Sequence, residues 1–404
     1  MSSTAHLVRR YAEGFDAAHL GEHGVASPLA LWVLLALAAR AASGPHRRRL
    51  EDALGTDAAD AARRAGELLA SPHPAVAAAV AVWDRAALCD QERFGAWAAD
   101  LPPAVERGPV PDQAGADAWA ARSTAGLVDA FPATLDPLVA VVLVSAFATS
   151  IRWAQPFDEA DPAELGGAFG ARARSALRVP VTGGHAVMLA ETDAAGTVGV
   201  HAARSGEGLE IVSVIAAPEV ATARVHRAAG EVAVLLAGGD GGARPRTLFD
   251  VAVGNGHAWT VEERWEEGSV TESCTALLTP WRASSFHDVG GDAGVEDVFA
   301  TLDGFLIPAA RPGTFQAVQA AGASYGREGF EGAAVTVLRA RPAGRPRRVR
   351  TRHATIRFNR PYAVVAVART TAPEMERGWA ERTVAPACWD GVPVFSAWVE
   401  RPGG

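Results

Sequence analysis

The sequence predicts an α+β fold in which helices come early in the chain and strands come late. The first third has apolar residues at helical spacing, separated by glycine and proline, whereas valine-rich segments typical of strands follow residue 180. Of the 404 residues, 49% are hydrophobic and 21% are charged, which is enough apolar surface to bury a sizeable core. No stretch rich in glycine or serine divides the chain.

Apolar spacing predicts the helices. In the first seventy residues they are expected over 6–15, 29–42, 47–54 and 57–70, and one more over 116–128. Gly55 should close the third of these, because glycine adopts the left-handed conformation that ends many helices.

Strands are predicted from short apolar and valine-rich runs. The run 75–83 suits a buried strand, and 138–153 suits a central strand covered on both faces. Later strands are expected over 208–216, 231–237, 247–253, 273–280, 314–323, 356–369 and 392–399.

Charge and composition exclude several classes of protein. The net charge of -8 argues against a general nucleic-acid binder. No apolar run reaches the roughly 20 residues that span a bilayer, and the first ten residues lack a secretory signal, so we expect no membrane association and a cytoplasmic protein. Cys89, Cys274 and Cys388 are widely scattered, which predicts free thiols. We expect no cofactor and no metal.

An arginine-rich segment covers residues 339–352. It holds seven arginines and is interrupted by Pro342 and Pro346, so we expect an exposed, solvated loop rather than a regular helix or a buried strand. It has no aromatic residue on which a nucleobase could stack, which argues against a nucleic-acid patch.

Three catalytic or ligand-binding motifs match only in part. Residues 322–326 fit the G-x-S-x-G hydrolase pattern, but His353 is the only later histidine and no amphipathic helix follows. The glycine run 238–242 lacks G-x-G-x-x-G spacing and predicts a turn. His19 and His23 have H-x-x-E-H spacing, but Gly21 between them favours a loop over a zinc-binding helix.

Taken together, fragments along nearly the whole chain resemble the serpin family. The early and middle ones are Ser27–Ala30, Arg49–Gly55, Leu143–Phe147, Trp153–Asp158, Leu278–Trp281 and Gly294–Phe299. The most specific ones lie near the end: Arg327–Thr336 is similar to the serpin hinge, Phe358–Tyr362 to the strand after the reactive loop, and Val392–Phe395 to the start of the last strand.

The resemblance implies one metastable serpin-like domain over residues 1–404, from a bacterial protein that acts as a monomer. Its α+β fold would have a central, mostly antiparallel sheet, further sheets, helices clustered in the N-terminal part, and an exposed reactive loop over about 327–353. The expected partner is a serine protease; an elastase-like or subtilisin-like enzyme is favoured, and a trypsin-like or furin-like enzyme is the alternative. The protease cuts the loop, and the cut loop then inserts into the central sheet and traps the acyl-enzyme, so the chain itself is not an enzyme.

The resemblance also assigns the hinge of this loop. The matching residues are Glu328, Gly329, Phe330, Glu331, Gly332, Ala333 and Ala334. From Phe330 onward every charged residue falls on one face of an extended strand, as insertion requires.

Other residues depart from the serpin pattern. Phe330 stands where inhibitory members have threonine or serine, Gly332 has poor strand propensity, and the polar cluster beneath the central sheet is altered at Ala30, Ser145 and Gln319. The alternative is therefore a non-inhibitory serpin-fold protein that binds a partner or serves another pathway, and that behaves as a protease substrate. Residues 370–391 form an apparent insertion without an assigned role.

Two criteria place the scissile bond differently. The family's usual spacing from the hinge places it at Ala343–Gly344. Charge favours Arg348–Val349 as a site for a trypsin-like enzyme. This site lies five residues further on, which lengthens the segment that would connect a trapped protease to the hinge. We expect inhibition through Ala343 and simple cleavage after Arg348.

Overall fold

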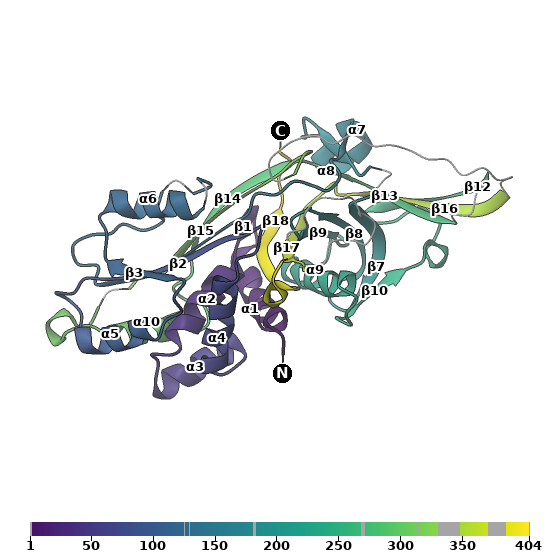
Figure 1. Ribbon diagram of the computed structural model, residues 1–404. Helices are drawn as coiled ribbons and strands as arrows, with labels where there is room; N and C mark the ends of the chain where they lie inside the picture. Colours follow the sequence, from purple (N-terminus) through teal and green to yellow (C-terminus); the bar gives the residue numbers. More distant parts are fainter. Residues whose placement is uncertain are drawn as a thin grey trace, which may run out of the picture.

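The computed structural model describes residues 2–124, 126–128, 130–180, 183–267, 271–313, 315–329, 348–370 and 385–403 (Figure 1). Within these ranges the α-helices are α1 (Thr4–His19), α2 (Pro28–Ala38), α3 (Gly44–Leu54), α4 (Ala58–Ala70), α5 (Gln91–Ala99), α6 (Gln113–Ser123), α7 (Pro162–Leu165), α8 (Gly167–Gly170), α9 (Thr222–Leu236) and α10 (Val295–Asp303).

The strands form four sheets, most of whose neighbours are antiparallel. Their bounds are β1 (Gly24–Ala26), β2 (Ala77–Asp84), β3 (Val105–Pro109), β4 (Val141–Ala148), β5 (Asp158–Ala160), β6 (Ala176–Arg178), β7 (His185–Thr192), β8 (Gly196–Arg204), β9 (Leu209–Ile215), β10 (Ala243–Arg246), β11 (Gly254–Asn255), β12 (Trp259–Glu267), β13 (Glu272–Leu278), β14 (Trp281–Asp288), β15 (Val318–Tyr325), β16 (Arg348–Arg357), β17 (Tyr362–Ala368) and β18 (Pro393–Val399).

The strand orders define the architecture. A seven-stranded sheet runs β1-β18-β17-β9-β8-β7-β10, and a six-stranded sheet runs β11-β12-β16-β13-β6-β5. Two smaller sheets, β3-β2-β4 and β14-β15, extend toward the left of Figure 1 with α6 above them and α2, α3, α5 and α10 below. The α+β class is therefore confirmed, with the early helices grouped around the smaller sheets.

Local sequence signals explain the helix ends. Gly55 adopts a left-handed conformation with φ of 77° and ends α3, as predicted. Asp57 begins α4 by accepting hydrogen bonds from the backbone N–H groups of Ala59 and Asp60. The four predicted early helices are confirmed as α1 to α4.

The strand β4 is packed on both faces, as the run 138–153 predicts, although the strand itself is shorter. One face meets a cluster formed with α6, in which Trp119 and Phe131 pack beside Val144. Leu143 and Phe147 face the main core on the other side, where α2 lies. Only the edge of β4 that faces away from β2 is left without a strand among the described residues.

Three strand predictions are wrong or incomplete. Residues 231–237 belong to helix α9, whose buried Val225, Ala229 and Val232 recur at helical spacing; the apolar run hid this period. Residues 247–253 form a short 3-10 helix, η1 (Leu248–Asp250), instead of a strand. The segment 356–369 is divided between β16 and β17, because Pro361 lacks the N–H that a continuous ladder would need.

The arginine-rich segment also differs from the expected exposed loop, because residues 348–352 open strand β16. Arg352 is only 9% exposed, and it can be buried because its donors are matched. Its Nε donates to Glu263, and its Nη1 donates to the carbonyl oxygens of Leu248 and Val251 at 2.6 and 2.8 Å.

Other expectations concern the cysteines, the insertion and membranes. Cys89, Cys274 and Cys388 are free thiols, as predicted. Residues 371–384 of the insertion lie outside the described ranges, but at its end Trp389 is fully buried and donates to the carbonyl oxygen of Ser71 at 2.7 Å. No helix in the described part of the chain has the length and apolar character to cross a membrane.

Candidate functional site: a groove between two strand edges

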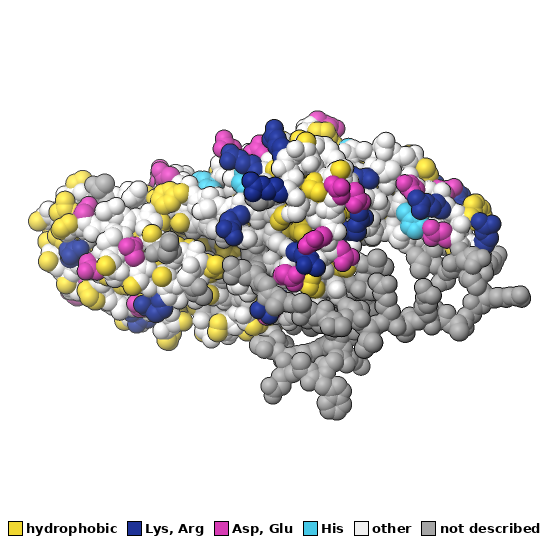
Figure 2. Space-filling view, turned by 90° about the horizontal axis from the view of Figure 1, so that it is seen from above, with side chains coloured by type: hydrophobic (Ala, Val, Ile, Leu, Met, Phe, Trp, Pro, Cys, Tyr) yellow, Lys and Arg dark blue, Asp and Glu magenta, His cyan; other side chains and the backbone are white. Residues whose placement is uncertain are grey.

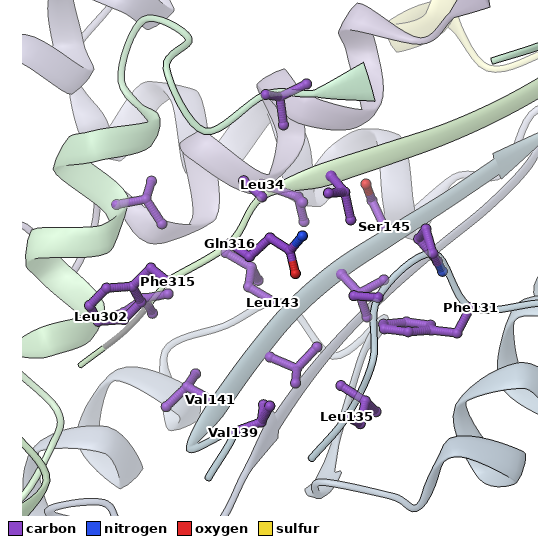
Figure 3. A pocket seen from close by; sticks show the side chains of 18 of the residues that line it. Leu34, Phe131, Leu135, Val139, Val141, Leu143, Ser145, Leu302, Phe315 and Gln316 are labelled. Atoms are coloured by element: carbon purple, nitrogen blue, oxygen red, sulfur yellow. The ribbon is translucent and has the colours of Figure 1, made fainter. Parts of the chain in front are cut away.

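A groove separates β4 from β15. In the described part of the chain, β4 pairs only with β2 and β3 lies beyond that, while β15 pairs only with β14. The space between the two strands has a volume of about 770 Å³ (Figure 3). Each wall of the groove therefore presents a strand edge whose backbone groups can still form a ladder.

The groove is lined mainly by apolar side chains. Val141 and Leu143 come from β4, Leu34 from α2, and Leu302 from α10; Figure 3 shows them converging on the same space. Among the described lining residues, Asp136 alone is ionisable. Such a lining suits an extended peptide whose inward side chains are small or apolar.

Hydrogen bonds tie both walls to the beginning of α2. On β15, Gln319 Oε1 accepts from the Ser27 N–H at 2.8 Å, and Gln319 Nε2 donates to the Ser27 carbonyl oxygen at 2.9 Å. On β4, Ser145 Oγ donates to the Ala30 carbonyl oxygen at 3.1 Å. The structure thus brings together Ala30, Ser145 and Gln319, the three positions that the sequence singles out.

The chain segments that follow β4 and β15 meet at one end of the groove. The Trp153 N–H donates to the Glu328 carbonyl oxygen at 3.2 Å, and Trp153 Nε1 donates to the Gly326 carbonyl oxygen at 2.9 Å. Gly329 pairs with Arg152 in an isolated bridge. The groove is therefore closed at the end where Glu328 and Gly329 lie.

Gly329 itself requires the absence of a side chain. Its φ is 144°, and a Cβ atom there would lie 2.4 Å from the carbonyl oxygen of Ile151. Any other residue would strain the backbone and separate the two segments. This close approach explains why the chain has a glycine at position 329.

A buried histidine pair lies behind the closed end. His185 Nε2 donates to the Gln155 carbonyl oxygen at 2.7 Å, so His185 Nδ1 can accept from His201 Nε2 at 3.0 Å. His201 Nδ1 then faces the hydroxyl of Tyr325 at 3.5 Å. Burial lowers the pKa of His185, and it holds the pKa of His201 well below its usual range. Both rings are neutral in this chain of contacts.

The predicted site residues fall partly inside the described ranges. Glu328 and Gly329 lie at the closed end of the groove, and Arg348 and Val349 open β16 opposite Glu267 and Glu266 of β12. The other predicted hinge and scissile residues lie outside the described residues: Phe330, Glu331, Gly332, Ala333, Ala334, Ala343 and Gly344.

The three partial motifs have ordinary structural roles. Ser324 lies within β15 and not on a strand-to-helix turn. Residues 238–242 join helix α9 to β10, so this turn follows a helix and not the strand that we expected. His19 Nε2 pairs with Asp292 at 2.8 Å, whereas His23 Nε2 donates to the Arg282 carbonyl oxygen at 2.9 Å. The two histidines therefore have separate partners.

Sequence reasoning missed the histidine pair behind the groove and one strand of the six-stranded sheet. The histidine pair comes from adjacent strands, β7 and β8, of a hairpin that was not predicted. Strand β12, which pairs with β16 over nine positions from Trp259 to Glu267, was also missed. The alternation of Trp259, Val261, Glu263 and Trp265 was the available signal for this strand.

Comparison with known proteins identifies the fold. No family model matches the sequence, and no curated protein matches it. Among solved structures, thyroxine-binding globulin in complex with thyroxine is similar over 99% of both chains, with a TM-score of 0.62 and 11% identity. Serpin48 of the insect Tenebrio molitor has a TM-score of 0.59 and 13% identity, over 98% of this chain and 97% of that one.

A third similar structure is the thermophilic serpin Tengpin in its native state. Its TM-score is 0.61 at 13% identity, over 98% of this chain and 92% of that chain. These likenesses extend over almost the whole of each chain, so this chain has the serpin fold.

Proposed function

We propose that this chain, which has the serpin fold, inhibits a serine protease as a monomer by inserting its cleaved loop between β4 and β15. The observation that carries the proposal is the groove itself. Two strand edges face an apolar space, and they meet at the end where the hinge residue Gly329 lies. Once the contacts of Trp153 with Gly326 and Glu328 open, a strand that enters from this end would pair with both edges.

The loop sequence suits such a strand. Both β4 and β15 are eight residues long. A strand of eight residues that begins at Phe330 ends at Val337, six residues before Ala343, so the scissile position need not be buried for the ladder to form. On the face that carries Phe330, the next residues are Gly332, Ala334 and Thr336, which are small or uncharged.

The chemistry of trapping needs no catalytic group from this chain. The protease serine attacks the carbonyl carbon of Ala343, the bond to the Gly344 nitrogen breaks, and that nitrogen leaves with a proton from the protease histidine. The acyl-enzyme then travels with the inserting loop. Distortion of the protease slows the attack of water on the ester, so the complex persists.

The setting of β16 supports Ala343 over Arg348 as the inhibitory position. Arg348 and Val349 lie within the β12–β16 ladder, in register with Glu267 and Glu266. A protease needs the residues around its scissile bond in extended form and free to pair with its own cleft. Cleavage after Arg348 would first require this end of the ladder to open.

The second candidate is a non-inhibitory serpin-fold protein, and Phe330 favours it. A phenyl ring forced between packed strands costs about 1–3 kcal/mol through overpacking and slows insertion. If water attacks the acyl-enzyme first, the protease is released and the chain is merely a substrate. Thyroxine-binding globulin, one of the similar structures, is named for binding thyroxine and not for inhibition.

One experiment separates the two candidates. The chain is incubated with subtilisin, pancreatic elastase, trypsin and furin, and the products are analysed by denaturing gel electrophoresis and mass spectrometry. An SDS-stable adduct supports inhibition, whereas complete loop cleavage without adduct with every protease supports the substrate alternative. As a control, each serine protease with its active-site serine chemically blocked should form no adduct.

A further inference from the structure

The far end of the β12–β16 ribbon carries an exposed aromatic and basic surface beside the loop. Trp265 of β12 is 63% exposed and lies directly opposite Arg350 of β16, two residues after the loop rejoins the sheet at Arg348. The next pair on the same face, Glu263 and Arg352, lies closer to the core. Figure 2 shows basic, acidic and apolar side chains gathered at this end of the molecule.

The basic part of this surface is held in place by its neighbours. Glu263 Oε2 accepts from Arg350 at 2.6 Å and from Arg352 at 2.9 Å. The guanidinium carbons of Arg350 and Arg352 lie 5.7 and 4.9 Å from the centre of the Phe249 ring. Phe249 is held in η1, whose Leu248 N–H donates to Glu272 at 2.7 Å. Arg350 would therefore lose little side-chain freedom on binding.

The position of this surface determines which partner can reach it. Ala343 lies five residues before Arg348, so it is at most about 17 Å of extended chain from the ribbon. A protease domain of about 200 residues has a radius of gyration of about 16 Å, and its surface lies roughly 20 Å from its centre. A protease that grips the loop at Ala343 therefore overhangs the end of the ribbon.

We propose that Trp265 and Arg350 form a secondary docking surface for the attacking serine protease, outside its catalytic cleft. This inference rests on the proposed function for the identity of the partner. Tryptophan and arginine are both enriched among the few residues that dominate binding energy at protein interfaces. The matching protease surface is an apolar patch with a carboxylate near the rim of its cleft, which accepts the indole and the guanidinium.

The test compares rates of loop cleavage and does not depend on adduct formation. Subtilisin, elastase, trypsin and furin are each presented with the intact chain and with a synthetic peptide of residues 338–349, which lacks Trp265. We expect at least one protease to cut the intact chain faster than the peptide, and Trp265→Ala to lower that rate by at least about tenfold. Trp265→Phe should retain most of the rate, which excludes misfolding as the cause.

A matched control is Leu127→Ala, which truncates another apolar residue, 48% exposed, in the segment that follows α6; Figure 1 shows α6 at the opposite end of the molecule from β12 and β16. It should change the rate by less than about twofold. The proposal is overturned if no protease prefers the intact chain, or if the preference survives Trp265→Ala. It is also overturned if the wild type sediments as a dimer that Trp265→Ala dissociates, since the face would then bind a second copy. Cleavage without adduct would disprove inhibition alone and leave this comparison valid.

Discussion

Gln319 and Ser27 are joined by two hydrogen bonds, in which the side-chain amide of Gln319 both accepts from and donates to the backbone of Ser27. Ser145 on the opposite wall of the groove contacts Ala30, three residues further along the chain. One short segment at the start of α2 thus holds both β4 and β15. Widening the groove for a new strand must shift or break these contacts.

Gln319→Ala should lower the free energy of unfolding by about 1–3 kcal/mol, because it removes two partners from a buried backbone segment. It should also speed insertion of the cleaved loop, since β15 is then free to move. Chemical denaturation measures the first effect, and the rate at which melting temperature rises after cleavage measures the second. Gln316→Ala, at an exposed glutamine lining the same groove, is the control and should change neither.

Stability should fall below about pH 6.5 because of His185 and His201. Burial lowers both pKa values in the folded chain, so the unfolded chain, with an ordinary histidine pKa, binds more protons in acid. The stabilising contribution is complete above that pH and is lost as the pH falls. His201→Gln should reduce this loss between pH 7 and pH 5, by up to about 1.4 kcal/mol per pH unit for one proton.

The comparison with wild type isolates this effect from other buried groups. Burial raises the pKa of Asp16 to about 7, so the folded chain holds this proton more tightly than the unfolded chain does. The stabilising contribution of Asp16 is therefore present in acid and is lost as the pH rises toward 7, which is the opposite of the histidine effect. Because Asp16 is present in both the wild type and His201→Gln, its contribution cancels when the two pH profiles are subtracted. His6→Gln, at an exposed histidine, should leave the slope unchanged. An unchanged slope in His201→Gln would mean that the buried pair does not control acid stability.

Phe330→Thr should lower the number of chains consumed for each protease molecule inactivated. The smaller side chain removes the overpacking that delays insertion, so fewer acyl-enzymes are hydrolysed first. Titration of a protease with each variant gives this ratio directly. A ratio that stays the same or rises would show that the ring has its own pocket in the inserted state.

The scissile bond can be identified from the small fragment released on complex formation. We expect the C-terminal peptide from a stable complex to begin at Gly344. A peptide that begins at Val349 is expected only from chains that were cut without trapping a protease. Finding Val349 at the start of the fragment from the stable complex would overturn the choice of Ala343.

Much of the fold was predictable because its signals are local. Gly55 ends α3 through its left-handed backbone, Asp57 begins α4 through its capping side chain, and β9 forms from a short run rich in valine and isoleucine. The second half of helix α9 was mistaken for a strand, because alanine, valine and leucine occupy positions on all sides of the helix there and hide its helical spacing. Arg352 was expected to be exposed to solvent because its partners are distant in the sequence. Glu263, Leu248 and Val251 lie 89, 104 and 101 residues before it.

The groove could not be predicted from sequence reasoning alone. Its walls come from segments as distant as Leu143 and Gln319, and the separation of two strand edges has no local sequence signal. The resemblance to serpins supplied the expectation of an insertable sheet and the positions of Ala30, Ser145 and Gln319. The structure supplied their contacts, the histidine pair and the ribbon that carries Trp265.

The most direct test is the melting temperature of the chain before and after a single cut in the loop. If the cut loop inserts between β4 and β15, several apolar side chains become buried and two ladders form, so the melting temperature should rise by about 10 °C or more. Leu143→Arg, which places a charge in the groove, should abolish that rise while leaving the cut itself unaffected. A cleaved wild-type chain that melts at the same temperature as the intact chain would contradict insertion.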